Sequence, residues 1–543
     1  MGIPSYYKKL IGTVPGLVSK GHPEETVSWL FMDFNCLIYH CLHREDTPLY
    51  PGDTDKDTWE LAFLDCVVRY CLKVIKEVKP TKGVYIAVDG VVPMAKMRQQ
   101  RLRRFKSIWL TEHASTAEAE GGADAVTPWD RNAITPGTLF MTKLRKKLTE
   151  MITKHGKKSW KLSSSDEPGE GEHKIIREWR TGKYAGNLAV YGLDADLIVL
   201  SMLGHETAAM AGKVWLFREE VHAGKMVYDA MGEEEFEWFS VSALTTWLCR
   251  EAGASDPRSF VLDYCFAMSV LGNDFLPSSL GLKMREDGHA ELLVMLRQLH
   301  AQGSTLVDQE SLVIRTESLL DFFCLLAEDE ESRVTKYVSR KKFQARNLEK
   351  SEVEVGDNDW PMYHMEEDVL LETSKTLVGN WRQVYLTRFF PGFQWSEIRA
   401  IAKEYLYGIQ WIWAYYTGRH EDVCYDWCYT FSLPPLWSWV CAYLQQEEGL
   451  PAFPDRGYAL IRATDIQPTE QLALVLPLES WSLLPPCPQR ALPYLAPHLF
   501  PASFSFDSVG KRFFWECESM IPLPSIRAIK DIVSSPPRPS PRQ

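Results

Sequence analysis

The sequence has few of the features that mark membrane, secreted or zinc-binding proteins. It has no N-terminal apolar segment of the signal-peptide kind, and acidic residues interrupt the longest apolar runs well before the about 20 residues that span a membrane. Its 12 cysteines are scattered and none forms a Cys-x-x-Cys pair, so a zinc knuckle is not supported. Several lie in apolar runs, which predicts buried thiols in a reducing compartment and a soluble, intracellular protein.

The sequence also lacks an overall excess of positive charge. The formal net charge of the 543-residue chain is −12, which excludes a protein coated in basic surface. Contact with nucleic acid must therefore be local, and basic stretches at residues 96–106, 143–161 and 339–350 allow it.

Aspartates follow the apolar runs that predict buried strands. Such runs cover residues 27–33 and 83–88, and a third begins at residue 187. The acids at their ends are Asp33, Asp89, Asp194 and Asp196. Open α/β sheets place their sites beyond the carboxyl ends of the strands, so we expect these side chains to meet.

Three further acids join this group. Glu170 and Glu172 lie at the predicted start of a helix, and an apolar stretch that begins at Phe266 ends in Gly-Asn-Asp274, which we interpret as another strand end. Asn35 is expected to cap the helix that follows Asp33. Carboxylate oxygens suit hard divalent cations, and two such ions about 4 Å apart can activate water and stabilise a leaving oxygen. The acids therefore predict metal-assisted phosphoester hydrolysis.

A basic segment follows Asp89 directly. Six cationic side chains follow Asp89, the last of them Lys106. Four polar residues recur there at helical spacings: Lys96, Gln100, Arg103 and Arg104. A basic helix is most often a solvated face, but the neighbouring acids favour a functional one. An arginine fork suits bidentate contact with phosphate and a lysine supplies a point charge, so this helix is interpreted as a phosphate clamp.

Four motifs resemble the catalytic core of the Xrn family of 5′→3′ exoribonucleases. They are Asp-Gly-Val-x-Pro-x-Ala-Lys-Met-x-Gln-Gln-Arg-x-Arg-Arg-Phe at 89–105, Gly-Glu-Gly-Glu-His-Lys at 169–174, Leu-Asp-Ala-Asp at 193–196 and Gly-Asn-Asp-Phe-Leu-Pro at 272–277. The likeness also includes residues 1–7, 134–138, 405–418, 468–477 and 510–515, and so covers nearly the whole chain. It implies an α/β fold with a mostly parallel central sheet flanked by helices, the flap-endonuclease or PIN-like nuclease fold, with a second, mainly helical part.

The resemblance assigns roles residue by residue. The acids that would hold two Mg²⁺ or Mn²⁺ ions are Asp33, Asp89, Glu170, Glu172, Asp194, Asp196 and Asp274. The residues that would hold a 5′-monophosphate are Lys96, Gln100, Arg103 and Arg104. The implied activity is processive hydrolysis of single-stranded RNA to nucleoside 5′-monophosphates. We also expect a cytoplasmic monomer that does not contact membranes, with the decapping machinery as a candidate partner.

The residues predicted to stack on the terminal base depart from the family pattern. Tyr39 stands where the family has a histidine, with His40 beside it, and a tyrosine ring can stack on a base equally well. Trp427 is our candidate for the opposite face of the base, although a tryptophan in such a region is more often part of a core. In the basic segment Val92, Met94 and Arg98 replace the usual residues, and the four phosphate-clamp residues are retained.

Two other functions remain as alternatives. A flap-type DNA endonuclease shares the acidic crevice, but such enzymes usually carry a Gly-x-Gly hairpin after the last aspartates, and none follows Asp274. An RNA-binding or scaffold protein that has lost activity would retain the fold, and the presence of all seven acids disfavours it.

Composition also predicts the division of the chain. We expect a nuclease core at 1–310, a helical connection at 311–350, an acidic linker at 351–367, a helical part at 368–533 and a disordered tail at 534–543. The small and acidic stretch at 114–125 is expected to be a loop or helix tip.

Overall fold

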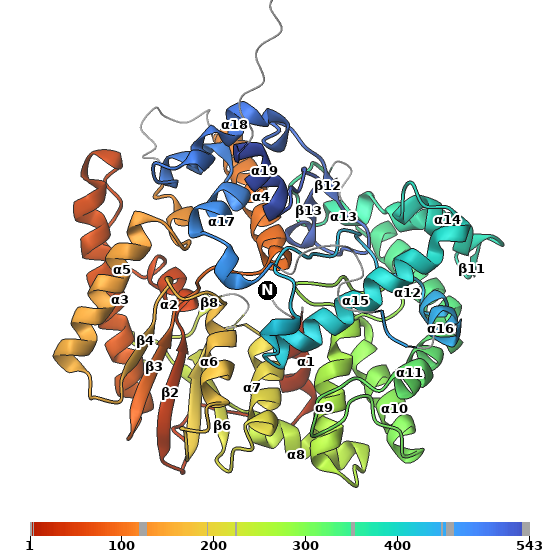
Figure 1. The fold of residues 1–543 in the computed structure, drawn as a ribbon, viewed down its shortest axis with the longest axis horizontal. Helices are drawn as coiled ribbons and strands as arrows, with labels where there is room; N and C mark the ends of the chain where they lie inside the picture. The colour runs from red at the N-terminus through yellow and green to blue at the C-terminus, as the bar shows by residue number, and fades with distance from the viewer. Residues whose placement is uncertain are drawn as a thin grey trace, which may run out of the picture. The chain divides into compact units, whose positions relative to one another are not determined.

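The chain folds into two compact units in a computed structural model that describes residues 3, 5–118, 128–192, 194–222, 225–348, 353–446, 449–451 and 461–534 (Figure 1). Unit 1 comprises Met1–Thr13, Thr246–Leu460 and Ser503–Ile521. Unit 2 comprises Val14–Thr245, Ile461–Ala502 and Pro522–Gln543. Each unit therefore gathers segments that are far apart in the sequence. The predicted tail after Ser534 and residues 119–125 of the predicted loop or helix tip at 114–125 lie outside the described residues.

A seven-stranded sheet in the order β1-β9-β6-β5-β2-β3-β4 forms the centre of unit 2. Its strands are β1 (Val18–Ser19), β2 (Val27–Asp33), β3 (Gly83–Ala87), β4 (Lys161–Ser163), β5 (Asn187–Tyr191), β6 (Val214–Glu219) and β9 (Phe236–Ser240). The five strands from β4 to β6 are parallel, and β9 runs antiparallel to both β6 and β1. The predicted α/β class with a mostly parallel sheet is confirmed.

The order of the strands creates a switch point between β2 and β5. After β2 the chain adds β3 and β4 on one side, then returns to place β5 and β6 on the other. Connections on either side of such a point leave a crevice at the carboxyl ends of the two strands, where open α/β sheets bind ligands. Asp33, the last residue of β2, lies at this end of the strand.

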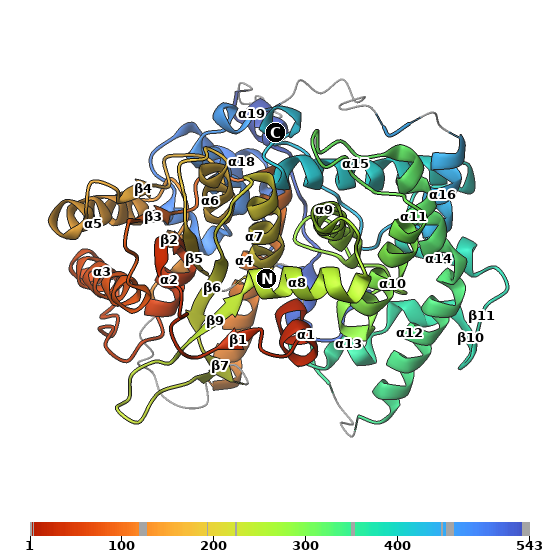
Figure 2. The ribbon, with the colours of Figure 1, turned by 90° about the horizontal axis from the view of Figure 1, so that it is seen from below.

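Helices cover both faces of the sheet, which explains why its strands are almost continuously apolar. Figures 1 and 2 show α3 (Lys56–Val78) and α5 (Leu139–His155) on one side, and α6 (Gly171–Trp179) and α7 (Asp196–Thr207) on the other. Alternate side chains of β2 pack on opposite faces of the sheet. Leu30 and Met32 join the core that α3 and α5 contribute to, whereas the ring of Phe31 packs edge-on against Trp179 of α6, with centroids 5.5 Å apart.

The basic segment forms α4 (Met94–Glu118), and one of its own cations anchors it. Arg101 is fully buried and donates hydrogen bonds to the carbonyl oxygens of Leu474 (2.6 Å), Pro522 (3.1 Å) and Leu499. These carbonyls belong to the C-terminal segments of unit 2, which include α17 (Pro468–Val475), α18 (Leu492–Leu495) and α19 (Ile526–Ser534). Arg101 therefore holds the helix in place.

Unit 1 is mainly helical. Its helices are α1 (Tyr6–Thr13), α9 (Pro257–Ala267), α10 (Gly288–Ala301), α11 (Thr316–Glu328), α12 (Glu330–Arg346), α13 (Trp360–Tyr363), α14 (Trp381–Phe389), α15 (Ile398–Tyr416) and α16 (Trp437–Gln446), and α8 (Val241–Ala252) spans the division between the units. The strand pairs β10 (Leu371–Thr373) with β11 (Thr376–Leu377) and β12 (Phe506–Asp507) with β13 (Glu518–Ser519) complete it, whereas β7 (Val221–His222) and β8 (Lys225–Met226) pair in unit 2.

Two predictions are wrong in unit 1. The apolar stretch before Asp274 is the end of helix α9 and a short 3-10 turn at Met268–Leu271, so Asp274 does not follow a strand. This helix is buried on all sides, and a continuous apolar run does not distinguish such a helix from a buried strand. Cys324 of α11 and Cys441 of α16 form a disulfide with a Cα–Cα distance of 5.5 Å, so these two cysteines are not free thiols. The other ten cysteines, all within the described residues, are outside any disulfide.

Candidate metal and phosphate site

Three parallel strands deliver aspartates to one edge of the sheet. Asp33 pairs in register with Ala87 of β3, and the preceding residue, Met32, pairs with Tyr191 at the end of β5. Asp89 follows β3 by two residues, and Asp194 and Asp196 follow β5. The carboxyl ends of the three strands are adjacent, so these acids come together as the sequence predicts. Asp194 is exposed, whereas Asp196 begins α7 and is buried.

Asp89 is held in position by hydrogen bonds. The side-chain amide of Asn35 donates to its Oδ2 (2.9 Å), and the backbone N–H of Gly171 donates to its Oδ1 (2.7 Å). The backbone N–H of Asp89 in turn donates to Oδ1 of Asn35 (3.2 Å). The prediction that Asn35 caps a helix is wrong: α2 (Phe34–Cys41) has Asp33 at its N-cap position, and Asn35 lies in the first turn. Its partner is 54 residues away, and no local pattern indicates such a contact.

The two glutamates enter the site from the first turn of α6. Glu170 is the N-cap residue, and Glu172 is the second residue of the helix. Their exposed fractions are only 4% and 5%. Gly171 allows this approach, because a Cβ atom there would lie 2.4 Å from Oδ1 of Asp33 and 3.0 Å from the carbonyl oxygen of Ala87. The helix N-terminus thus packs directly on the ends of β2 and β3, and its partial positive charge favours carboxylates there.

The pKa values of three of these acids are raised by burial and by the negative charges of their neighbours. Burial, followed by the charges of Asp89, Asp194 and Asp196, holds the pKa of Asp33 well above its usual value. Burial and the charges of Asp196 and Glu170 do the same for the pKa of Glu172. The pKa of Asp89 is also raised by burial, while the Gly171 hydrogen bond and nearby Lys96 and Lys174 oppose the rise. Six of the seven predicted acids therefore lie within electrostatic reach of each other in unit 2.

The donor set fits a hard divalent cation. Ligand atoms of Glu170, Glu172 and His173 all lie within 4.8 Å of one another, and all three side chains are buried. Buried carboxylates whose like charges repel each other are stabilised by a bound cation, and a set dominated by carboxylate oxygen suits Mg²⁺ or Mn²⁺. His173 was not singled out from the sequence, although it directly follows Glu172 in the motif.

The last residue of the same motif supports the site. Lys174 is 1% exposed, and its ammonium donates to the carbonyl oxygens of Val88 (2.6 Å) and Ser164 (2.8 Å). Burial lowers its pKa to about 8. Lys174 thus ties α6 to the residue before Asp89, a role that the sequence pattern does not reveal.

The four predicted phosphate residues differ in their surroundings on α4. The ammonium of Lys96 lies 2.5 Å from Oε2 of Glu170. Gln100 accepts a hydrogen bond from the side chain of Gln471 (3.4 Å), and Arg103 is exposed. Arg104 is 7% exposed and donates through one terminal nitrogen to Oγ1 of Thr135 (2.7 Å).

Arg104 is a buried cation. Burial lowers its pKa to about 10, so its guanidinium is still charged at neutral pH. Its second terminal nitrogen is buried and has no hydrogen-bond partner. A buried donor without a partner is costly, and an anion would satisfy both its charge and its hydrogen bond.

The two predicted stacking residues lie in different units. Tyr39 of α2 is half-buried against the core of unit 2 and is near enough to Arg104 to influence its pKa. Its neighbour His40 contacts Oε1 of Glu234 at 2.9 Å. Trp427, in unit 1, is 7% exposed and donates to Oε1 of Glu404 (3.0 Å). Its indole packs on Trp411, with centroids 5.1 Å apart, so its part in base stacking stays a prediction.

Asp274 also belongs to unit 1. It is half-buried and follows Gly272 and Asn273 in a tight turn, in which the Asn273 side chain accepts from the backbone N–H groups of Phe275 (2.9 Å) and Leu276 (3.0 Å). This turn gives the aspartate a defined backbone position within its own unit. Its membership of the acidic site stays a prediction.

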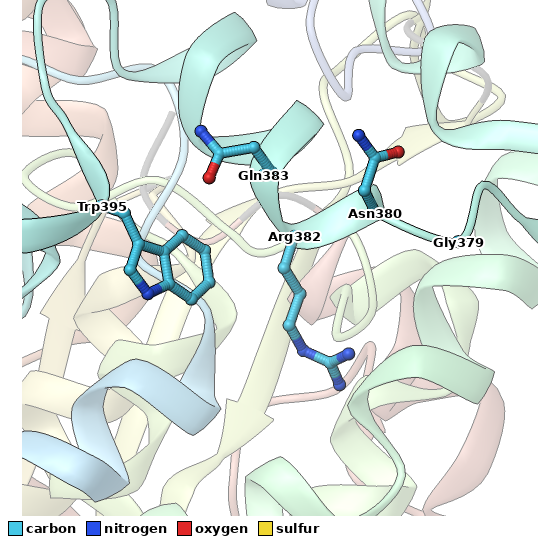
Figure 3. Close-up of a pocket in the computed structure, with 5 residues that line it drawn as sticks. All are labelled: Gly379, Asn380, Arg382, Gln383 and Trp395. Carbon is cyan, nitrogen blue, oxygen red and sulfur yellow. The ribbon is translucent and has the colours of Figure 1, made fainter.

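Unit 1 also has a surface hollow of about 390 Å³ at the start of α14. Figure 3 shows that Asn380, Arg382 and Gln383 project from one segment and Trp395 from another. Arg382 lies 3.3 Å from Oε2 of Glu331, and this ion pair offsets its charge. The five lining residues include none of those predicted from the sequence, and the cation among them, Arg382, is paired with Glu331, which disfavours contact with a phosphate backbone.

Comparison with known proteins shows which family the chain resembles. Residues 1–218 match the model of the XRN 5′-3′ exonuclease N-terminus. Matches to individual relatives extend over the rest of the chain. The chain is 28% identical to 5′-3′ exoribonuclease 1 of Homo sapiens, over 96% of this chain and 33% of that protein. It is 25% identical to 5′-3′ exoribonuclease 1 of Schizosaccharomyces pombe, over 98% of this chain and 48% of that protein.

A third Xrn relative matches a shorter region. The 5′-3′ exoribonuclease 1 of Saccharomyces cerevisiae is 32% identical over 56% of this chain and 21% of its own length. The chain thus spans between about a fifth and a half of these curated relatives. Within the part of the chain that the structure describes, no helix is both long and apolar enough to cross a membrane.

Proposed function

We propose that the protein is a processive 5′→3′ exoribonuclease that converts single-stranded RNA with a 5′-monophosphate into nucleoside 5′-monophosphates. The observation that carries this proposal is the meeting of six crowded carboxylates with the basic helix α4, through the contact between Glu170 and Lys96. The names of the Xrn relatives, 5′-3′ exoribonucleases, support the same activity.

The acids would hold two divalent cations, Mg²⁺ or Mn²⁺. Their carboxylates come from the strand ends and the first turn of α6, with Asp274 as the proposed seventh: Asp33, Asp89, Glu170, Glu172, Asp194, Asp196 and Asp274. When bound, such ions lower the pKa of a water and neutralise charge on the departing oxygen of a phosphodiester. The protein fixes the positions of the ligands: Asn35 and Gly171 orient Asp89, and Lys174 ties α6 to the end of β3.

The 5′-phosphate would bind along α4. Arg104 has a buried positive charge and an N–H group without a hydrogen-bond partner, and Arg103 has an exposed positive charge. Gln100 adds a neutral hydrogen-bond donor and Lys96 a charged one. Charge-assisted hydrogen bonds of this kind grip a terminal phosphate, whereas a 5′-hydroxyl has no anion to bind. A cap or triphosphate would exceed the space for a single phosphate group.

The product of each turnover supports processive action. Hydrolysis that leaves a phosphate on the next nucleotide makes the shortened RNA a substrate again, so the strand can advance without release. Tyr39 would stack on the first base, and Trp427 is the proposed second ring. We further propose that the protein acts in the cytoplasm as a monomer, with the decapping machinery as a candidate source of substrates.

One assay tests this function. Uniformly labelled single-stranded RNA with a 5′-monophosphate, a 5′-hydroxyl or a cap is incubated with the protein in Mg²⁺ or in chelator. We expect mononucleotide release from the monophosphate RNA alone, and only with Mg²⁺. Equal digestion of all three ends would contradict end recognition, whereas cleavage of flapped duplex DNA in preference to RNA would favour a flap endonuclease. Tight RNA binding without any turnover would favour an inactive scaffold.

A further inference from the structure

Lys96 contacts the acidic cluster although it belongs to the phosphate helix. Its ammonium lies 2.5 Å from Oε2 of Glu170, and the two side chains are only 15% and 5% exposed. The positive charge of Lys96 also opposes the rise that burial causes in the pKa values of Asp33, Asp89 and Glu172. One ammonium group thus offsets part of the charge of several acids at once.

The same residue begins the row of predicted phosphate contacts. Lys96, Gln100 and Arg104 are spaced by four residues on α4, so they lie on one face of the helix in successive turns. A phosphate held by Arg104 and Gln100 would approach the face that carries Lys96. The ammonium therefore has two candidate partners, the Glu170 carboxylate and a phosphate group.

These two partners compete for one charge. A carboxylate oxygen that is paired with an ammonium is a poorer ligand for a divalent cation. The ammonium and the cation repel each other, and both need the same oxygen. The lysine stem is flexible and its ammonium is a compact point charge, so Lys96 can exchange one anionic partner for another without movement of α4.

We propose that Lys96 couples the metal site to the phosphate site: its ammonium competes with a divalent cation for Glu170, and a bound 5′-phosphate draws it away. This inference rests on the proposed function and adds to it a coupling between the two binding events. Binding of the cation and binding of the phosphate each favour the other, and by linkage the two effects are equal in size. A 5′-phosphate end therefore completes the metal site, and an end without phosphate leaves Glu170 paired with Lys96.

The test measures binding rather than turnover. Calorimetric titration gives the affinity of the full chain for Mn²⁺ with and without saturating adenosine 5′-monophosphate, and for the nucleotide with and without Mn²⁺. For the wild type we expect each to tighten the other by the same factor, at least about fivefold. Adenosine, which lacks the phosphate, should have no such effect.

Substitutions at Lys96 separate this coupling from other causes. Lys96→Met and Lys96→Gln should bind Mn²⁺ more tightly than the wild type in the absence of nucleotide, and the nucleotide should no longer change that affinity. Lys96→Arg keeps a cation and should keep most of the coupling. Arg103→Met is the matched control, because this exposed residue lies on the same helix away from the Glu170 pair: it should weaken nucleotide binding and leave Mn²⁺ affinity alone unchanged.

The outcomes distinguish this inference from the proposed function. If both neutral variants fold, as judged by near-ultraviolet circular dichroism, and bind Mn²⁺ no more tightly than the wild type, Lys96 does not compete for Glu170 and the inference is wrong. Coupling of wild-type size in those variants would overturn it as well. Either result can coexist with mononucleotide release from 5′-monophosphate RNA, in which case the proposed function stands. Absence of both release and nucleotide binding in the wild type would overturn both.

Discussion

Asp196 combines deep burial with a position at the start of a helix. It is 4% exposed and is the first residue of α7, where the helix dipole favours a negative charge. Its charge is nevertheless one of the causes that raise the pKa values of Asp33 and Glu172. A residue that destabilises its neighbours in the absence of a compensating cation is characteristic of a functional site, because selection for stability alone would remove it.

Substitution Asp196→Asn should therefore separate stability from turnover. In chelator the variant should unfold at a higher temperature than the wild type, since one of the crowded charges is gone. Turnover of 5′-monophosphate RNA should fall by about 100-fold, because a proposed metal ligand is lost, while RNA binding in chelator is retained. Differential scanning fluorimetry and a filter-binding assay provide the measurements. Asp166→Asn, at an exposed residue that pairs with Arg145, is the control and should change neither quantity. A lower unfolding temperature for Asp196→Asn would instead indicate a structural role.

Tyr39 tests whether a ring other than histidine serves at its position. If it stacks on the first base, Tyr39→Ala should lose on the order of 1 to 3 kcal/mol of binding free energy and stall processive decay, whereas Tyr39→His should keep most activity. Single-turnover assays on 5′-monophosphate RNA measure this difference. Equal losses of thermal stability in both variants, with unchanged activity per folded molecule, would show that the half-buried ring is only part of the core.

At the scale of secondary structure, the start of α6 decides the geometry of the site. Its first turn delivers two acids and an N–H donor to the ends of β2 and β3, and this requires a backbone without a side chain at Gly171. The turn before the helix also depends on a glycine. Gly169 has a φ of +109°, a backbone conformation that suits glycine alone.

Substitution Gly171→Ala should push α6 away from the sheet. The new Cβ would lie 2.4 Å from Oδ1 of Asp33, so we expect a loss of about 1 to 3 kcal/mol of unfolding free energy and a large loss of turnover. Gly12→Ala is the matched control, because a Cβ at that exposed helical position meets no atom within 4 Å. It should be neutral or slightly stabilising. Urea unfolding compares the two, and equal effects would show that the close approach is not needed.

Glu234 joins two helices to the segment before β9. Its carboxylate contacts Nε2 of His40 on α2 (2.9 Å) and Nζ of Lys73 on α3 (3.3 Å), and it also pairs with Arg44. Burial raises its pKa, but the hydrogen bond and charge of His40, with the charges of Arg44 and Lys73, outweigh burial and lower the pKa to about 2. Because the folded-state pKa lies below the unfolded one, the stabilisation is complete above about pH 4.3 and is lost as the pH falls toward 2.

Glu234→Gln should therefore destabilise the protein in a pH-dependent way. Above pH 5 we expect a loss on the order of 1.5 to 3 kcal/mol, and the difference from the wild type should shrink as the pH falls below the unfolded-state pKa. Chemical unfolding between pH 3 and 7 measures it. Glu233→Gln, whose side chain is 65% exposed, should have little effect at any pH. A constant difference across this range would contradict the assigned ionisation.

For the whole molecule, the sheet and most of the site could be predicted because their signals are local. An apolar run followed by an acid indicates a strand end, and this rule correctly identified the ends of β2, β3 and β5. It failed at Asp274, where a fully buried helix has the same apolar pattern. Contacts between residues far apart left no local signal: the Asn35–Asp89 pair and the Cys324–Cys441 disulfide, whose cysteines are 117 residues apart, were not predicted.

Hydrogen exchange can test the proposed metal site across the whole chain. Addition of Mn²⁺ should slow exchange in peptides that contain Asp33, Asp89, the first turn of α6 and the start of α7, because a bound cation stabilises the folded state that holds it. If Asp274 is a ligand, the turn at 272–278 should gain protection too. Peptides from α12 serve as the control and should not change. Protection of the unit 2 peptides without that of 272–278 would remove Asp274 from the proposed ligand set.

The switch point between β2 and β5 also affects how the protein is made. Asp33 and Asp196 meet only after more than 160 residues of intervening chain have folded between them. During synthesis, domains fold as units while the chain emerges from its N-terminus. A ribosome that has made the chain only as far as the end of α4 therefore carries the basic helix without the acids at the start of α6 and after β5. Such a nascent chain exposes cations before it contains the complete set of acids proposed to bind metal.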